Sequence, residues 1–294
     1  MQATTSPIAH IQRAIGRHLS HARKALLDEK LDDDSVHNAR KSLKRARSGL
    51  RLLRPLDEKN YQRGNMRLRN VGRRLSGVRD HRVLLARIAE LLADEDKPAR
   101  RKLLLALRKD LYNTRRRDWR ALRSHDALER IAETLGEVAR DVRRWRLPPE
   151  SNGATELAVE ILYRKGRKAL ARSRKKPTNE RLHEARKQAK HLAHALEMLG
   201  NGATPKKTKK VLSRAEDLGD WLGDDHDLAV VESRFIALPQ ADEKPKRKLR
   251  ATLEKRRGRL QRKALKTADK LFRKKTRKML ARAAERASVS APAD

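Results

Sequence analysis

Two segments of the chain carry histidine, arginine and lysine at the same helical spacing. Shifting the sequence by 146 residues lays residues 182–199 on residues 36–53, and seven of the eighteen positions are identical. The paired basic positions are His37 with His183, Arg40 with Arg186, Lys41 with Lys187, and Lys44 with Lys190. An arginine fork fits two phosphate oxygens, and a lysine adds a mobile point charge. The repeated rows therefore indicate a site for a phosphate-rich polyanion.

Each basic row continues along one face of an expected helix. We expect the first segment to be helical from Asp34 until Pro55 stops it, and Ser48 and Arg51 extend its row at steps of three and four. His194 extends the second row. No Asp or Glu follows a basic residue of the first row at i+4, although such pairs stabilise helices by about a few tenths of a kcal/mol each. The missing countercharge indicates that a ligand supplies it.

The other face of both segments is apolar at helical period, which predicts a helix-bundle core. The apolar positions are Val36, Ala39, Leu43, Ala46, Leu50 and Leu53 in the first segment, and Leu182, Ala185, Ala189, Leu192, Leu196 and Leu199 in the second.

The helix expected before each row has a basic side of its own. We expect the first of these helices from Pro7 to Asp28, with its apolar residues inward. The basic positions that could add to the site are Arg13, Arg17 and Lys24, with Arg164, Lys168 and Arg172 as their counterparts.

Two aspartates are the acids most similar to a catalytic pair. Asp80 ends the segment LSGVRD and Asp227 ends LGDDHD, a second match between the halves that is one residue out of phase. We interpret both as structural ion-pair partners of basic residues on the preceding helix. His226 with Asp227, and His125 with Asp126, resemble the HD dipeptide of metal-dependent phosphohydrolases. No other His or Asp has the spacing of further ligands, so we expect no metal site.

Composition narrows the possible functions. The chain of 294 residues has 75 Lys plus Arg against 38 Asp plus Glu, a formal net charge of +37. Self-repulsion at this charge favours a polyanionic partner. The absence of cysteine excludes disulfides, thiolate nucleophiles and cysteine metal sites. No GxxxxGK[ST] loop occurs, and eight aromatic residues are too few for base stacking as the main binding mode. We expect a protein without catalysis and without a cofactor.

The whole chain is expected to be all-α, because Gly and Pro are scarce and no stretch alternates with period two. The further expected helices are Glu58–Leu92, Pro98 to Trp119, Asp126–Trp145, Ala154–Ser173, Thr178–Leu199, Thr204–Leu238 and Asp242 to about Ala287. The prolines of RLPPESNG predict a linker at 147–153 between an N-terminal half, 1–146, and a C-terminal half, 154–287. Residues 288–294 are expected to be a disordered tail.

Localisation follows from segments that the sequence lacks. No stretch approaches the roughly 20 apolar residues of a membrane span, and the N-terminus has no signal-peptide core. A cytoplasmic protein is expected. The oligomeric state stays open.

The paired motifs VHNARKSLKRAR and LHEARKQAKHLA, each followed by LSGVRD or LGDDHD, resemble the CHAD family, the histidine-containing α-helical domains. The resemblance extends from about residue 8 to 286. It implies two four-helix bundles related by a pseudo-twofold axis, with a basic groove between them. It also implies binding of inorganic polyphosphate and association with polyphosphate granules, without known catalysis.

The sequence therefore predicts that a polyphosphate chain binds between the two basic rows. The first row should carry the larger share of the affinity. Two alternatives stay open. One is a nucleic-acid-binding protein without sequence preference, since +37 attracts any phosphate backbone. The other is a metal-dependent phosphohydrolase that uses Asp80, Asp227 and His226.

Overall fold

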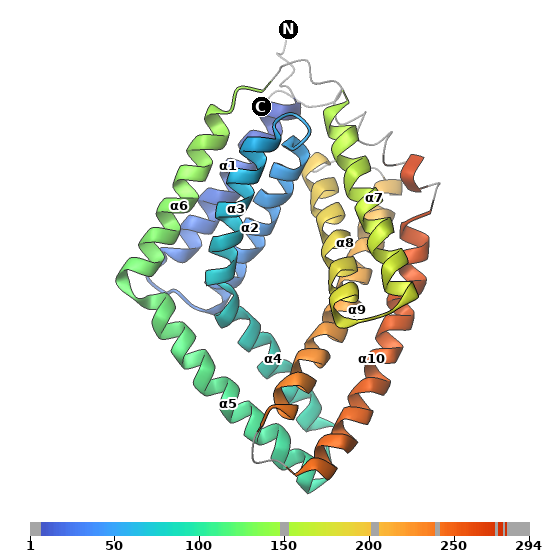
Figure 1. Cartoon of the computed structure of the whole chain (residues 1–294). Coiled ribbons are helices and arrows are strands. Elements are labelled where there is room, and N and C mark those ends of the chain that lie inside the picture. The colour runs from blue at the N-terminus through green and yellow to red at the C-terminus, as the bar shows by residue number, and fades with distance from the viewer. Residues whose placement is uncertain are drawn as a thin grey trace.

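The computed structural model describes residues 7–147, 153–200, 206–238, 242–273, 276–278 and 280, apart from the side chain of His125. Within these ranges the chain is helical, with no strand (Figure 1). The helices are α1 (Pro7–Leu26), α2 (Asp33–Leu53), α3 (Glu58–Arg74), α4 (Ser76–Ala93), α5 (Pro98–Arg123), α6 (His125–Arg144), α7 (Ala154–Lys175), α8 (Asn179–Leu199), α9 (Lys206–Ile236) and α10 (Glu243–Leu271). The all-α prediction is confirmed. None of the helices in the described ranges is long and apolar enough to cross a membrane.

The first basic segment forms α2 much as its sequence predicts. The carboxylate of Asp32 accepts hydrogen bonds from the backbone amides of Asp34 and Ser35, at 2.9 and 2.8 Å, and so caps the helix. All six expected apolar positions are buried. Ser48 departs from the prediction, because it is buried rather than part of the basic row. Its neighbour Gly49 brings α2 close to other helices, which draws this part of the helix into the core.

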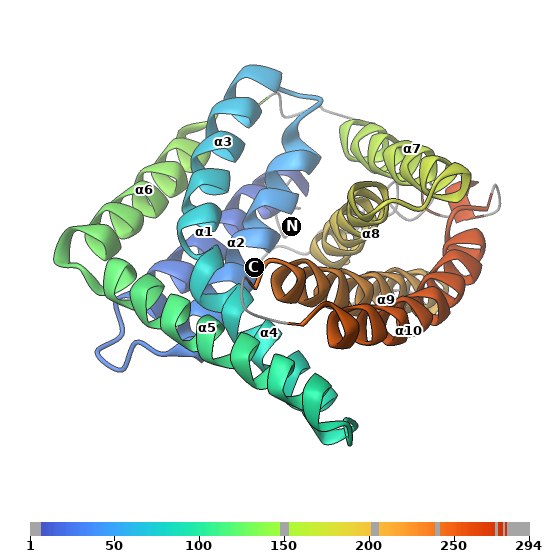
Figure 2. The same cartoon turned by 60° about the horizontal axis from the view of Figure 1, so that its bottom comes forward.

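Each half of the chain builds a helical bundle (Figures 1 and 2). In the first half α2 packs on α1 and α3, and α6 covers α1 and α3 from outside. In the second half α8 packs between α7 and α9, and α10 lies along the outer side of α9. The two innermost helices, α2 and α8, also contact each other. The two basic rows therefore belong to adjacent helices.

The helix expected over Glu58–Leu92 is two helices, with the break at Leu75 and Ser76. The break lets α4 leave the first bundle and pack on α5 and α9. At the start of α4, a Cβ on Gly77 would lie 2.2 Å from a carboxylate oxygen of Asp118 on α5, so a larger residue here would displace that side chain at the crossing. The second half has no such break in α9, which runs for 31 residues.

The final expected helix is interrupted after Leu271, and its expected end at 281–287 lies outside the described residues. Helix α10 ends at Leu271, whereas the sequence predicts helix to about Ala287. Residues 276–278 and 280 are helical as well. The tail expected at 288–294, and most of the linker expected at 147–153, lie outside the described residues.

Two apolar cores connect the halves. The larger core runs through α1, α2 and α3 and on into α7, α8 and the first part of α9. The smaller core lies at the far end, where Ile88 of α4 and Leu107 of α5 pack with Phe235 of α9 and Leu253 of α10. Because both cores contain residues from both sides of the linker, the two halves share their apolar packing.

Gly49 of α2 is a point of close packing with α1 and α8. A Cβ on Gly49 would lie 2.5 Å from Cγ1 of Ile15 in α1 and 2.8 Å from the sulfur of Met198 in α8. We expect Gly49→Ala to lower the free energy of unfolding by about 1–3 kcal/mol, because overpacking outweighs the gain in helix propensity. Gly16→Ala is the matched control. No atom lies within 4 Å of its new Cβ, and it should stabilise α1 by up to about 1 kcal/mol. Urea denaturation measures both changes, and equal stabilisation by the two variants would contradict the close packing.

Candidate functional site: a basic cleft between the halves

A cleft of about 1410 Å³ lies between α2 and α8 and is completed by α3, α4, α5, α7 and α9. Counted over the described residues, its lining holds thirteen Lys or Arg, six His and four Asp. A formal excess of nine positive charges in one concave surface attracts anions strongly, since the low-dielectric walls focus the field.

The sequence-predicted rows both line this cleft. From α2 come His37, Arg40, Lys41, Lys44 and Arg51, and from α8 come His183, Arg186, Lys187, Lys190 and His194. Tertiary packing thus brings together ten residues that are separated in the sequence by the linker.

The repeated arginines make equivalent contacts in the two halves. Arg40 donates from Nη1 to the carbonyl oxygen of Gly72 on α3 at 3.0 Å. Arg186 donates from Nε to the carbonyl oxygen of Gly219 on α9, also at 3.0 Å. A Cβ on Gly219 would lie 2.2 Å from Cε of Lys190, so glycine leaves room for the lysine stem as well. These contacts fix the guanidinium groups while leaving other N–H groups free for a ligand.

The two aspartates behave differently from each other. Asp80 Oδ1 lies 3.5 Å from Arg40 Nη2, which is the orienting ion pair expected for it. For Asp227 the expected pair is missing, since no cation among the described residues lies within 4 Å of its carboxylate. Burial raises the pKa of Asp227, although the longer-range charges of Arg186 and Arg87 oppose this rise. Arg186 is instead bonded to the Gly219 carbonyl.

Lys44 lies close enough to both rows for charges on each of them to act on it. Its side chain reaches solvent, but the cleft walls reduce its hydration, and this desolvation lowers its pKa to about 8. The next largest contributions come from the positive charges of Arg40 on its own helix and Arg186 on α8. On the same helix, burial and the charge of Arg47 lower the pKa of Arg51 to about 10. The free cleft therefore contains unrelieved positive repulsion, which a bound polyanion would remove.

The cleft histidines have lowered pKa values for the same reasons. Partial burial, then Arg79 and Lys44, lowers the pKa of His37. Burial, then His226, lowers the pKa of His183, whose ring centroid lies 4.8 Å from that of His226 on α9. Burial lowers the pKa of His191 well below its ordinary value. The free protein therefore holds these imidazoles neutral near pH 7.

The additional basic residues proposed from the preceding helices lie elsewhere. The cleft lining, as far as the described residues define it, includes none of Arg13, Arg17 and Lys24 on α1 or Arg164, Lys168 and Arg172 on α7. All six are exposed. Helix α1 lies behind α2, so its basic side faces away from the cleft. On α7 the cleft is lined by Ala158, Ile161, Leu162 and Lys165, so Lys165 is the basic residue of this helix that faces it.

Several lining residues were not predicted. The clearest are Arg47 and Arg54, which follow Lys44 and Arg51 by three residues each and could have been found by continuing the row at steps of three and four. Two others lie on helices that the sequence analysis did connect with the site, His191 on α8 and Lys165 on α7. The rest come from α3, α4 and α9: Arg69, Arg79, Asp220, His226 and Arg234. Asp220 Oδ1 accepts from Lys190 at 2.9 Å. Their positions depend on how α3, α4 and α9 cross the rows.

The cleft offers hydrogen-bond donors rather than a metal cage. Among the described residues no group of three or more His, Asp or Glu side chains is arranged to hold a metal ion. His125, one of the histidines of the two HD dipeptides, has its side chain outside the described set. Tyr61 is the one Phe, Tyr or Trp among the described lining residues. The arrangement suits electrostatic binding of a chain of phosphates.

Fold and cleft together define an all-α protein with a strongly basic groove between two helical halves. The CHAD domain model matches residues 10–237, and the chain belongs to this family. The crystal structure of the CHAD domain from the plant Ricinus communis is similar, with a TM-score of 0.62, 20% identity, and coverage of 99% of this chain and 95% of that one. PptA from Streptomyces chartreusis has a TM-score of 0.65 at 14% identity, covering 90% of this chain and 99% of its own. These likenesses show the fold. Comparison with curated proteins finds no match.

Proposed function

We propose that this protein binds inorganic polyphosphate in the basic cleft, without catalysis and without a cofactor. The proposal includes a cytoplasmic location, on polyphosphate granules where these form. Family membership supports it, since polyphosphate binding is a general property of CHAD domains. The observation that carries it is the pair of basic rows on α2 and α8, which face one cleft. The charges of Arg40 on α2 and Arg186 on α8 both act on Lys44.

The dimensions and chemistry of the cleft suit a chain of linked phosphates. The row from His37 to Arg51 extends about 21 Å at 1.5 Å per residue, much longer than a single phosphate group. Cations from two helices can contact a thin chain from both sides. With one Tyr in the described lining, base stacking adds little, so a nucleobase gains no specific partner there.

Competition between polyanions tests the proposal. Binding of labelled polyphosphates of graded length should tighten until the chain fills the cleft and then level off. Unlabelled polyphosphate should displace DNA or RNA from the cleft at a much lower phosphate concentration than the reverse. Stronger competition by nucleic acid would reject polyphosphate as the cleft ligand. Release of free phosphate from polyphosphate with Mg²⁺ or Mn²⁺ would reject the non-catalytic part.

The affinity should rise as the pH falls from about 7.5 to 5.5. His37 and His183 have lowered pKa values in the free protein, and nearby phosphates would raise them, so binding takes up protons. The gain appears as the pH falls through the bound-state pKa values and levels off below those of the free state. A His37→Gln, His183→Gln double variant should have a flatter pH profile. His21→Gln, an exposed α1 control, should leave the profile unchanged, and equal profiles for all three proteins would contradict the role of the cleft histidines.

A further inference from the structure

Helix α10 carries a second basic row that does not belong to the cleft. The row consists of exposed residues at steps of three, four and seven: Lys244, Lys248, Lys255, Arg259, Arg262, Lys266 and Lys270. At about 100° per residue these side chains fall within about 80° of the helix circumference and extend about 39 Å along it. No residue of α10 is found in the cleft lining as described. We call this row the outer α10 row.

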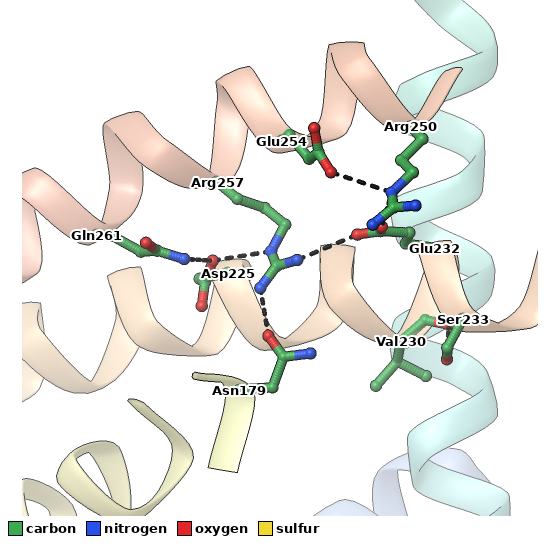
Figure 3. A network of polar contacts seen from close by, with 9 residues as sticks. All are labelled: Asn179, Asp225, Val230, Glu232, Ser233, Arg250, Glu254, Arg257 and Gln261. Carbon is green, nitrogen blue, oxygen red and sulfur yellow. Dashed lines mark hydrogen bonds and ion pairs between the residues drawn. The ribbon is translucent and has the colours of Figure 1, made fainter. Parts of the chain in front are cut away.

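On the side of α10 that faces α9, arginines are paired with carboxylates of α9 and of α10 itself (Figure 3). Arg257 donates to Asp225 of α9 at 3.0 Å and to Glu232 of α9 at 3.1 Å. Arg250 pairs with Glu232 and with Glu254, both at 3.0 Å.

The acids of α10 are all used in such pairs. Besides Glu254, Glu243 pairs with Lys246, and Asp269 pairs with Arg174 of α7. The outer row has no ion-pair partner within the described part of the chain. Its seven charges are therefore compensated only by solvent and by whatever binds there.

The fold itself does not require this excess of charge. Helix α6 has the corresponding outer position in the first half, where it covers α1 and α3 (Figure 2). Its sequence, HDALERIAETLGEVARDVRR, mixes five acids with four arginines. Arg67 of α3 pairs with Glu137 and Asp141 on this helix. An outer helix with balanced charge is thus compatible with this architecture, whereas α10 has thirteen Lys or Arg against three acids.

The shape of the outer α10 row favours a rigid linear polyanion over a membrane. A membrane-binding helix inserts an apolar face, but the apolar residues of α10 are buried against the neighbouring helices, as with Leu249, Leu253 and Leu271. A narrow straight row also fits a line of phosphates better than a plane of headgroups.

One-sided contact favours duplex nucleic acid over a second polyphosphate chain. A flexible chain must be ordered along a row that touches it on one side only, which costs conformational entropy. A duplex is straight over this length, since its persistence length is about 150 bp. At 3.4 Å per base pair the row matches about one helical turn of DNA. The row has no aromatic side chain, so single-strand stacking is not offered. We infer that the outer α10 row binds the phosphate backbone of double-stranded nucleic acid, without sequence preference, while the cleft remains free for its own ligand.

The test uses the full chain and a labelled 30-bp duplex of random sequence, followed by fluorescence anisotropy at several salt concentrations. The variant Lys255→Glu, Arg259→Glu, Arg262→Glu should bind the duplex at least about 30-fold more weakly near 0.1 M salt, and should lower the salt slope by about 2.7. Its exposed positions leave the core untouched, and circular dichroism should show unchanged helicity.

The matched control is Arg13→Glu, Arg17→Glu, Lys24→Glu on α1, which changes the net charge equally at exposed sites outside the cleft. It should bind the duplex within about threefold of the unmodified protein at the same salt. Equal losses for the two triple variants would show attraction by net charge alone and overturn the inference. Loss of duplex binding in Lys44→Glu would place the duplex in the cleft and overturn it too.

Two further binding measurements distinguish this inference from the polyphosphate proposal. The α10 variant should keep its affinity for polyphosphate, and duplex binding should persist even if the unmodified protein fails to bind polyphosphate. The α10 variant and the unmodified protein should bind equally to vesicles that contain anionic lipid. If vesicles need the row and the duplex does not, the assignment to nucleic acid is wrong.

Discussion

Lys44→Glu should abolish polyphosphate binding and at the same time raise the melting temperature of the free protein. The side chain lies where positive charges from α2 and α8 act together. Burial is the largest cause of its lowered pKa, about 8, and the charges of Arg40 and Arg186 lower it further. A carboxylate at this position would attract the same arginines and repel phosphate. We expect an affinity loss of at least about 100-fold, or about 2.7 kcal/mol. Relief of about 1 kcal/mol of repulsion should raise Tm by about 2 °C.

Opposite changes in binding and stability make this variant informative, because a misfolded protein loses both. Lys168→Glu on α7 is the matched control. Lys168 is exposed, lies outside the cleft lining and has Arg164 and Arg172 four residues away on either side, so the charge change and the local sequence are similar. Calorimetry should give it an affinity within about threefold of the unmodified protein. If Lys44→Glu and Lys168→Glu lose affinity equally, the cleft is not the binding site.

Raising the salt concentration from 50 to 200 mM should weaken polyphosphate binding by more than about 10³-fold. A bound chain that engages about eight of the cleft cations releases a similar number of counterions, which predicts a slope of about −6 in a plot of log affinity against log salt. The thirteen Lys and Arg of the described lining make this many contacts available. Isothermal titration at four or more salt concentrations measures the slope.

Chain length supplies the internal control for the salt experiment. A triphosphate occupies a small part of a row about 21 Å long and should show a much shallower slope. A slope that is the same for triphosphate and for long chains would mean that the cations do not act as one extended surface. Replacing chloride by sulfate at equal ionic strength should weaken binding further, since sulfate competes for the same arginines.

The contents of the α2 and α8 rows could be predicted from the sequence because both of their determinants are local. Helical period places Arg40 and Lys44 on one face and Leu43 and Leu50 on the other, whatever surrounds the helix. The repeat then marked the same face on α8. All ten basic residues proposed for the rows line the cleft, whereas Ser48 is buried. The larger share of affinity expected from the α2 row stays a prediction.

Residues contributed by other helices could not be predicted in the same way. A neighbouring helix can rotate about its axis without changing its own period, so the sequence does not decide whether Arg164 or Lys165 of α7 faces the cleft. In the structure Lys165 lines the cleft beside Ile161 and Leu162, and Arg164 does not. The break at Leu75 was not predicted from the helical period either, and it lets α4 cross α5 near Gly77.

By itself the sequence determined that this protein is all-α, strongly basic and equipped with two matching cationic helix faces. Those properties depend on side-chain type and on spacing along one helix. Only the tertiary structure decided that the two faces meet in one cleft, that α1 turns its basic side away, and that α10 directs a third row outward. These outcomes depend on which apolar faces bury one another, and that is a property of the whole chain.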